Sequence, residues 1–336
     1  MKRLMKNKFF FVLLMMGGAY LFSTLLIALF FRPVSAGLET FFLAPFTHRL
    51  SLGNWLNRAT LYMFSGSAVV LAFQGGEFNL GGEGQICLGG LVTVIFFSFW
   101  EPVWALGGMA LAFLFSALAS GLLSALSGVI KNRTGLSEVI TTYLLSMGVV
   151  VFSRYFITGP FKDETSYLVT TPPIPEAYRL GEILPPSHLN ITFFFALLLI
   201  VLLHLFLYHH PGGYEWRLCG INSDFAVYCG IDRRAQRIKT LFSSGALNGF
   251  TGSILILGTT HRGIQDFFSG YGWNGIAVSL IGGNNPLLLL PSSLFFSHIA
   301  QGTEKMEIIG QFPYPLDGFI MGLVFLVVTS GRLGRD

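Results

Sequence analysis

Polar side chains gather in two glycine-rich breaks between long apolar runs, one break in each half of the chain. The first, residues 75–90 (GGEFNLGGEGQICLGG), carries the carboxylates of Glu77 and Glu83. The second, residues 282–286 (GGNNP), lies in the apolar run 273–300. Polar backbone at bilayer depth is tolerated only where protein buries it or where it lines a cavity. Two such breaks therefore predict a transport site near the bilayer midplane.

The side chains of these breaks can bind a polar solute through hydrogen bonds. The residues predicted to line the translocation pathway are Asn79, Glu83, Gln85, Asn274, Asn284 and Asn285. The alternative interpretation is structural, because the same side chains can satisfy backbone groups that a break leaves free. In that interpretation Glu77 and Glu83 pair with loop cations or reach the membrane interface.

Membrane-spanning helices must position these breaks. The 336-residue chain is 52% hydrophobic and only 11% charged, which excludes a soluble globular protein. A crossing needs about 20 apolar residues, so the apolar runs supply roughly eight to ten crossings or half-crossings. We predict an all-α polytopic membrane protein with broken or re-entrant half-helices in two related halves. Residues 1–336 are expected to form a single transmembrane domain.

The basic residues predict which side of the membrane each loop occupies. The expected spans are 9–31, 56–73, 86–100, 102–130, 139–158, 190–208, 240–258 and 316–330, together with the interrupted run 273–300. The first is expected to be an uncleaved helix, because its apolar run exceeds the roughly 7–15 residues of a signal-peptide core. Segment 32–54 is predicted to be an external loop with a short surface helix.

Loop charge then orients the chain. The basic residues of the N-terminus and of loop 209–239 place both in the cytoplasm, whereas the acidic, proline-rich loop 159–189 belongs outside. The same rule favours a turn at 284–286 that joins two re-entrant half-helices, since the C-terminal Arg332 and Arg335 then end inside.

The longest polar stretch on the predicted cytoplasmic side is 213–231 (GYEWRLCGINSDFAVYCGI), and it predicts a short helix over 222–228. Asn222 or Ser223 can cap this helix, while Phe225, Ala226 and Tyr228 give it an apolar face. A helix of this kind can dock into a groove on a partner protein. It can equally lie on the lipid surface as an amphipathic helix.

Other reactive side chains carry no predicted site. Cys87, Cys219 and Cys229 give no disulfide framework, and no acidic residue is spaced with the membrane histidines to bind a metal. Ser65 and Ser67 would need a histidine within reach to serve as hydrolytic nucleophiles, and no spacing indicates one. An ion-coupled secondary transporter, with Glu77 or Glu83 as the coupling carboxylate, is the alternative class.

Five segments together resemble the permease subunits of ATP-binding-cassette importers for nucleosides and simple sugars, within the larger group that includes branched-chain amino acid permeases. The segments are EFNLGGEGQ (77–85), KNRTGLSEVITTYLL (131–145), the stretch 213–231, SGALNGFTG (244–252) and GWNGIAVSLIGGNNPL (272–287). The resemblance covers nearly the whole chain. The sequence departs from the family pattern at 144–146, where Met-Leu-Asn is common, and at Asn248, where a small residue is common.

The resemblance implies a bacterial inner-membrane subunit with several partners: a second permease subunit, a cytoplasmic ABC ATPase dimer, a periplasmic or lipoprotein substrate-binding protein, and membrane lipid. Loop 209–239 would couple to the ATPase through Gly220, Asn222, Phe225, Ala226, Tyr228 and Gly230.

The sequence itself contains no GxxxxGK[ST] phosphate loop. ATP and Mg²⁺ are therefore expected on the ATPase, with no cofactor and no enzymatic activity in this chain. The basic residues border apolar runs, so no nucleic acid is expected as a partner. The two break motifs resemble the nucleoside branch of the family more than the ribose branch. The resemblance therefore implies a nucleoside-like solute, with riboflavin or a simple sugar as alternatives.

Overall fold

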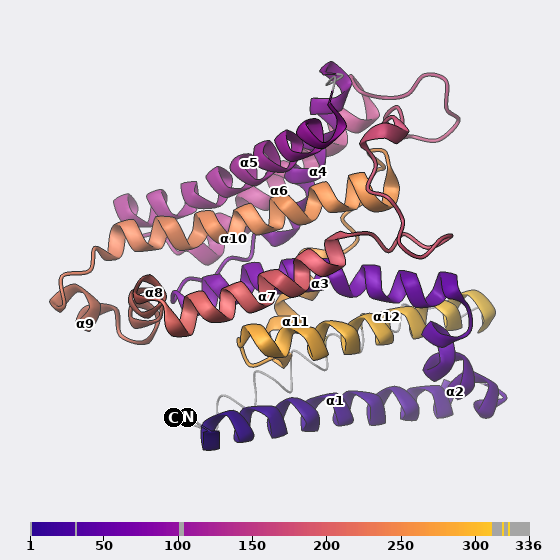
Figure 1. Ribbon diagram of the computed structural model, residues 1–336, viewed down its shortest axis with the longest axis horizontal. Helices are drawn as coiled ribbons and strands as arrows, with labels where there is room; N and C mark the ends of the chain where they lie inside the picture. Colours follow the sequence, from indigo (N-terminus) through magenta and orange to yellow (C-terminus); the bar gives the residue numbers. More distant parts are fainter. Residues whose placement is uncertain (1, 31, 101–103, 311–317, 319–321, 323–336) are drawn as a thin grey trace.

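Helices account for the regular structure in the described part of the chain, which is residues 2–30, 32–100, 104–310, 318 and 322 of a computed structural model (Figure 1). The α-helices are α1 (Lys2–Phe30), α2 (Val34–Leu43), α3 (Arg49–Gln74), α4 (Gly82–Phe99), α5 (Ala105–Thr134), α6 (Glu138–Thr158), α7 (Thr192–His209), α8 (Pro211–Ile221), α9 (Ser223–Tyr228), α10 (Arg233–Leu255), α11 (Tyr271–Ile281) and α12 (Leu289–Gly310). Short 3-10 turns lie at Ala44–Phe46, Glu176–Tyr178 and Pro286–Leu288, and a π-helical turn, Ile256–Thr260, extends α10.

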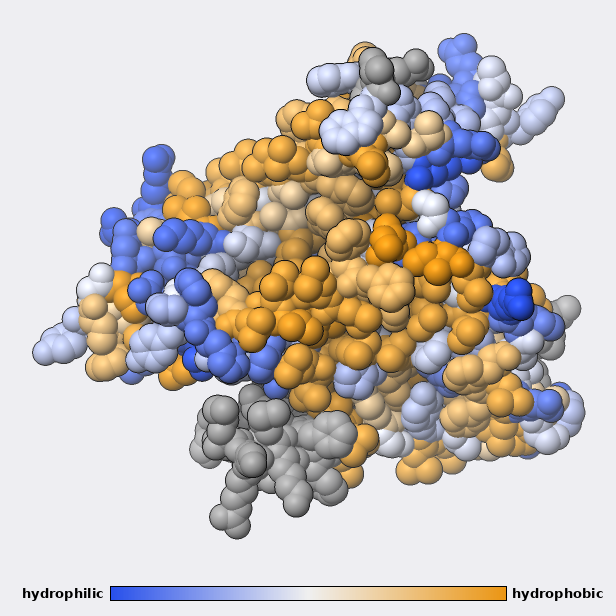
Figure 2. Space-filling model, viewed as in Figure 1, coloured by the Kyte–Doolittle hydropathy of each residue, from blue (hydrophilic) through white to orange (hydrophobic). Residues whose placement is uncertain are grey.

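The predicted fold class, an all-α polytopic membrane protein, is confirmed. Six of the described helices, α1, α4, α5, α6, α7 and α10 with its π-helical turn, are long and apolar enough to cross a bilayer. Figure 2 shows a hydrophobic surface over α5 and α7 that separates two polar ends of the molecule. Helices α3 and α12 have 26 and 22 residues but are more polar, and α11 has only 11 residues. Most residues of α3 are buried, because it lies inside the bundle.

Small residues of α10 form the centre of the core. This helix packs against α3, α4 and α5. Gly245 and Gly249 face the backbone of α5, and Gly252 faces the backbone of α4 at Ile86. Small residues let membrane helices approach at backbone distance, which replaces the hydrophobic driving force that lipid cannot supply. The SGALNGFTG segment is thus the close-packing face of α10.

The two ends of the molecule carry different elements (Figure 1). Helices α8 and α9 and the start of α1 lie at one end, which we call the α9 end. Loop 159–191 lies at the opposite end, which we call the loop end. Segment 32–54 does contain a short helix, α2, but α3 begins at Arg49, earlier than the expected start at residue 56.

The first break is shorter than expected. Residues 75–81 are non-helical, but α4 begins at Gly82, so the GEGQICLGG half of the predicted break is helical. The glycines of this half lie inside the helix, where they let α6, α10 and α11 approach α4 closely instead of turning the chain.

The second break turns the chain back on itself, as expected. Helix α11 runs toward the α9 end, and α12 returns toward the loop end (Figure 1). The expected pair of half-helices is wrong for its second member: α11 is about 16 Å long at 1.5 Å per residue, whereas α12 has 22 residues. Apart from residues 318 and 322, the expected span 316–330 lies outside the described residues, as do the C-terminal arginines.

Candidate translocation and coupling sites

The N-termini of α4 and α11 meet inside the bundle through Glu83. This side chain is 5% exposed and lies in the first turn of α4. Its two carboxylate oxygens accept hydrogen bonds from the backbone N–H groups of Gly270 at 2.7 Å and Gly272 at 2.8 Å. A carboxylate is favourable at a helix N-terminus, where unpaired N–H groups carry positive partial charge. Glu83 therefore joins the start of α4, which follows the first break, to the start of α11, which precedes the second break.

Gly272 permits this close approach. A Cβ atom at this position would overlap the backbone nitrogen of Glu83. The contact explains why a glycine stands at the start of α11, where any other residue would force the two helix ends apart.

Asn79 and Gln85 form a reciprocal amide pair that ties the first break to α10. Each side-chain amide nitrogen donates to the other residue's oxygen at 2.9 Å. Asn79 also donates to Ser244 at 2.9 Å and accepts from the N–H of Gly81 at 3.0 Å. Asn248 donates to Gln85 at 2.8 Å. Both members of the pair are buried, so in this conformation their hydrogen bonds hold residues 75–81 in place.

The two departures from the family pattern meet this same break. Ser146 of α6 accepts a hydrogen bond from the N–H of Gly84 at 2.7 Å, and Asn248 of α10 bonds Gln85 from the other side. The Oδ1 atom of Asn248 is buried without a partner among the described residues. Ser146 and Asn248 thus supply polar contacts to the first turn of α4.

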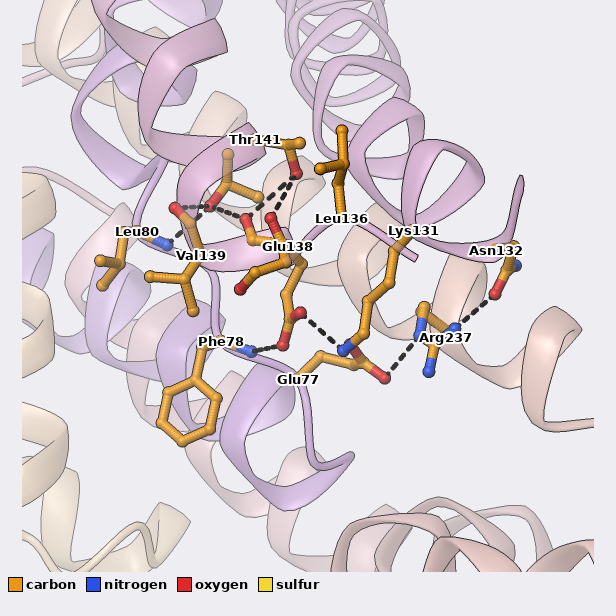
Figure 3. Close-up of polar contacts among 12 residues, drawn as sticks. Glu77, Phe78, Leu80, Lys131, Asn132, Leu136, Glu138, Val139, Thr141 and Arg237 are labelled. Carbon is orange, nitrogen blue, oxygen red and sulfur yellow. Dashed lines mark hydrogen bonds and ion pairs between the residues drawn. The ribbon is translucent and has the colours of Figure 1, made fainter. Parts of the chain in front are cut away.

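Figure 3 shows an ion cluster that holds the other end of the break. Glu77 accepts from Lys131 of α5 and from Arg237 of α10, each at 2.9 Å, and Lys131 also pairs with Glu138 of α6 at 2.6 Å. Arg237 donates further to Asn132. Two carboxylates and two cations balance, and Glu77, Glu138 and Arg237 are at most 8% exposed. The cluster fixes Glu77 to α5, α6 and α10.

Asn284 and Asn285 lie beyond the C-terminal end of α11, away from the other predicted pathway residues. The carbonyl oxygen of Asn284 accepts from Gln74, the last residue of α3, at 2.6 Å. Its Oδ1 accepts from Ser279 at 2.9 Å, while Asn285 accepts from the N–H of Leu287 at 3.1 Å. The second break therefore contacts the end of α3.

Asn274 stands apart from both groups, on the first turn of α11. Its Nδ2 donates to the hydroxyl of Tyr62 at 3.0 Å. The six predicted pathway residues therefore occupy three places: the junction of α4 with α10 and α11, the start of α11, and the turn after α11. That they line the pathway stays a prediction.

An ion pair that the sequence did not predict lies near Asn274. Arg58 of α3 donates to Glu304 of α12 at 2.6 Å, and the two residues are 246 positions apart. A signal was present, because Arg58 falls within the expected span 56–73 and a charge inside a span needs a partner. No local pattern could identify that partner.

The predicted coupling residues form an exposed element at the α9 end. Asn222 caps α9 by accepting from the N–H of Phe225 at 2.9 Å, as expected. Phe225 and Tyr228 are 48% and 88% exposed. Ala226 is completely buried against its own chain, so its expected place on the exposed apolar face is wrong. Gly230 ends the element with a φ of 85°, which favours glycine.

Gly220 connects this element to the first break. A Cβ atom on Gly220 would overlap the carbonyl oxygen of Gln74, and Gly76 faces the Cα atom of Gly220. A cavity of about 170 Å³ lies beside this contact and is lined by Glu77, Cys219 and Arg237 among others. Helix α8 therefore touches the break directly, next to the ion cluster.

In the part of the chain that the structure describes, no histidine bonds to the serine residues considered as nucleophiles. Ser65 donates to the carbonyl oxygen of Tyr62 at 3.5 Å, and the buried hydroxyl of Ser67 has no hydrogen-bond partner among the described residues. A general base is needed to activate a serine hydroxyl, so this arrangement gives no support for hydrolysis.

A polytopic helical bundle with paired breaks and a projecting short helix defines the class of solute-transport permeases. The chain belongs to the family described as branched-chain amino acid transport system / permease component, whose model matches residues 51–329. No solved structure matches this chain.

Three relatives show the range of solutes in the family. A guanosine ABC transporter permease of Bacillus subtilis is 27% identical, over 88% of this chain and 86% of the relative. A probable riboflavin import permease of Treponema pallidum is 27% identical, over 88% and 78%. A glucose ABC transporter permease of Haloferax volcanii is 27% identical, over 91% and 83%.

Proposed function

We propose that this chain is a membrane subunit of an ATP-binding-cassette importer and forms half of the translocation pathway for a nucleoside-like solute. A second permease subunit supplies the other half. A cytoplasmic ABC ATPase dimer binds ATP and Mg²⁺, and a separate substrate-binding protein delivers the solute. The family match over residues 51–329 supports this function.

The exposed apolar surface of α9 is the observation that carries the proposal. Phe225, Val227 and Tyr228 are 48%, 54% and 88% exposed on a capped helix that projects from the bundle (Figure 1). An ordered helix with exposed apolar side chains suits the groove of a partner protein. Because Gly220 touches the first break, a partner that moves α8 and α9 also moves that break.

The α9 end is proposed to face the cytoplasm of a bacterial cell, across the inner membrane. Basic residues near this end support the orientation, since cytoplasmic loops carry an excess of Lys and Arg. They are Arg133, Arg217, Arg233, Arg234 and Lys239. The N-terminus of α1 lies at the same end and is cytoplasmic in this orientation.

A nucleoside is the proposed solute, because the break motifs resemble the nucleoside branch of the family. Relatives named for guanosine and for nucleosides support this choice, the latter 24% identical over 93% of this chain. The riboflavin and glucose relatives support the alternatives. Ion coupling has less support, since Glu77 and Glu83 already have cationic or N–H partners on both carboxylate oxygens.

The test is affinity purification of the tagged chain from native membranes in mild detergent, followed by identification of the proteins that accompany it. A second permease and an ATPase are expected. A Tyr228→Asp variant should lose the ATPase but keep its membrane insertion. Tyr167→Asp, a matched change in the loop 159–191, should keep it. A chain that purifies alone and moves solute down an ion gradient would overturn the proposal.

A further inference from the structure

A cavity of about 260 Å³ opens between α3, α11 and α12 in the half of the molecule nearer the loop end, and we call it the outer pocket. Its lining includes Arg58, Tyr62, Tyr271, Asn274 and Glu304, and Ser269 also borders it. These residues come from both halves of the sequence, and α11 leads into the second break at 282–286. The pocket thus lies where a transport site is expected, between two parts of a broken fold.

The charges of the pocket lie within two long helices, away from the helix ends. Arg58 is about 14 Å along α3 from its start, at 1.5 Å per residue. Its partner Glu304 is about 9 Å before the end of α12. Charges inside a span are expensive and face water-filled cavities or one another. The side chains of this pair remain 28% and 54% exposed, so the pair borders open space.

Asn274 lines the same space and carries an unsatisfied acceptor. The residue is 8% exposed, and its Nδ2 is taken by Tyr62. Its Oδ1 is buried without a partner among the described residues. A buried acceptor left unpaired is costly, and a hydroxyl donor placed in the pocket would satisfy it.

The aromatic rings complete the lining. Tyr62 and Tyr271 have ring centroids 5.4 Å apart at an interplanar angle of 50°. Aromatic faces bind the apolar face of a ring, while the carboxylate of Glu304 and the Oδ1 of Asn274 accept from hydroxyl groups. The guanidinium of Arg58 is already paired with Glu304, which leaves little attraction for an anion.

We propose that the outer pocket is a solute-binding site of the permease, and that it takes an uncharged ring with hydroxyl groups, such as the ribosyl part of a nucleoside or a free sugar. This inference rests on the proposed function and adds the site and the chemical class of its ligand. Asn274 and Glu304 would accept from the hydroxyls, and Tyr62 and Tyr271 would cover a face of the ring.

The test is protection of a single cysteine in vesicles that hold the whole transporter. Ser269→Cys is placed at the edge of the pocket, with Cys87, Cys219 and Cys229 changed to serine. A charged, membrane-impermeant thiol reagent is applied with guanosine, glucose or guanosine monophosphate. Tyr167→Cys, in the loop 159–191, is the matched control and should label at one rate throughout.

Guanosine is expected to slow labelling of Ser269→Cys about tenfold at ten times its dissociation constant. Protection by glucose as well would identify the sugar ring alone as the ligand, and guanosine monophosphate should protect poorly. In the Ser269→Cys background, Asn274→Leu should raise the half-protecting concentration about tenfold.

ATP-dependent uptake of labelled guanosine in the same vesicles separates the two proposals. Uptake without protection would overturn the outer pocket and leave the importer function standing. Protection without ATP-dependent uptake would overturn the importer function and leave the outer pocket as a binding site. Equal protection by guanosine and its monophosphate, or an unchanged half-protecting concentration in Asn274→Leu, would overturn the proposed ligand chemistry.

Discussion

Replacing Glu83 tests whether the junction of α4 and α11 is a structural joint. The carboxylate accepts from Gly270 and Gly272 at 2.7 and 2.8 Å inside the bundle. Hydrogen bonds to a charged group contribute about 1.5–3 kcal/mol each. In Glu83→Ala both N–H groups lose their partner, so we expect the free energy of unfolding to fall by about 3–6 kcal/mol.

Glu83→Gln separates charge from shape. Glutamine keeps one acceptor oxygen and presents an amide donor to the second N–H, so about 2–3 kcal/mol should be lost. The assay is thermal denaturation in detergent, with the folded fraction at each temperature measured by size-exclusion chromatography. Glu176→Gln is the control, because its weak pairing with Arg179 at 3.8 Å is exposed and contributes little.

The order of stability among the variants shows whether Glu83 is a structural joint between α4 and α11. We expect wild type and Glu176→Gln to be equal, Glu83→Gln to be lower and Glu83→Ala to be lowest. If Glu83→Gln keeps full stability and loses only the dependence of transport on an ion gradient, the carboxylate is a coupling group and the joint argument is refuted.

Three further predictions concern the α9 end. Glu77→Gln and Arg237→Met should each lower the free energy of unfolding by about 3–5 kcal/mol, because each leaves a buried charge without its partner. In a double-mutant cycle measured in detergent, the double variant should lose less than the sum of the two single losses. Simple additivity would contradict the ion cluster. Gly220→Ala should lower the free energy of unfolding by about 1–3 kcal/mol, because the new methyl group overlaps Gln74, and it should uncouple ATP hydrolysis from uptake. Gly148→Ala is the control and should change neither, because no atom lies within 4 Å of a Cβ at that position. Cys229 is exposed and should be alkylated fastest. Burial raises the pKa of Cys219, so the alkylation of Cys219 should be slower and should speed up with rising pH as the thiolate forms. Mass spectrometry measures both rates, and faster reaction at Cys219 would refute this.

Hydropathy and local capping were enough to predict most of the elements. The long apolar runs set the spans, since a helix in lipid must satisfy its own backbone. The short helix α9 followed from the Asn222 cap and the apolar residues after it. Both features depend on neighbours in sequence, which is why the sequence alone could reveal them.

Features that depend on contacts between distant segments were not predictable. The glycines after Gly82 predicted a break, yet they are helical because α10 approaches them closely. Ala226 was expected to face outward, but tertiary packing turns it inward. The partner of Arg58 lies in α12, and no periodicity links the two residues.

The pairing of Arg58 with Glu304 has a consequence for biosynthesis. Glu304 follows Arg58 by 246 residues, so at about 5–20 residues per second it is made roughly 12–50 s later. Until then α3 carries a charge whose insertion costs up to about 3 kcal/mol. We therefore expect α3 to stay at the insertion machinery, or to pack against the helices already inserted, until α12 has been made.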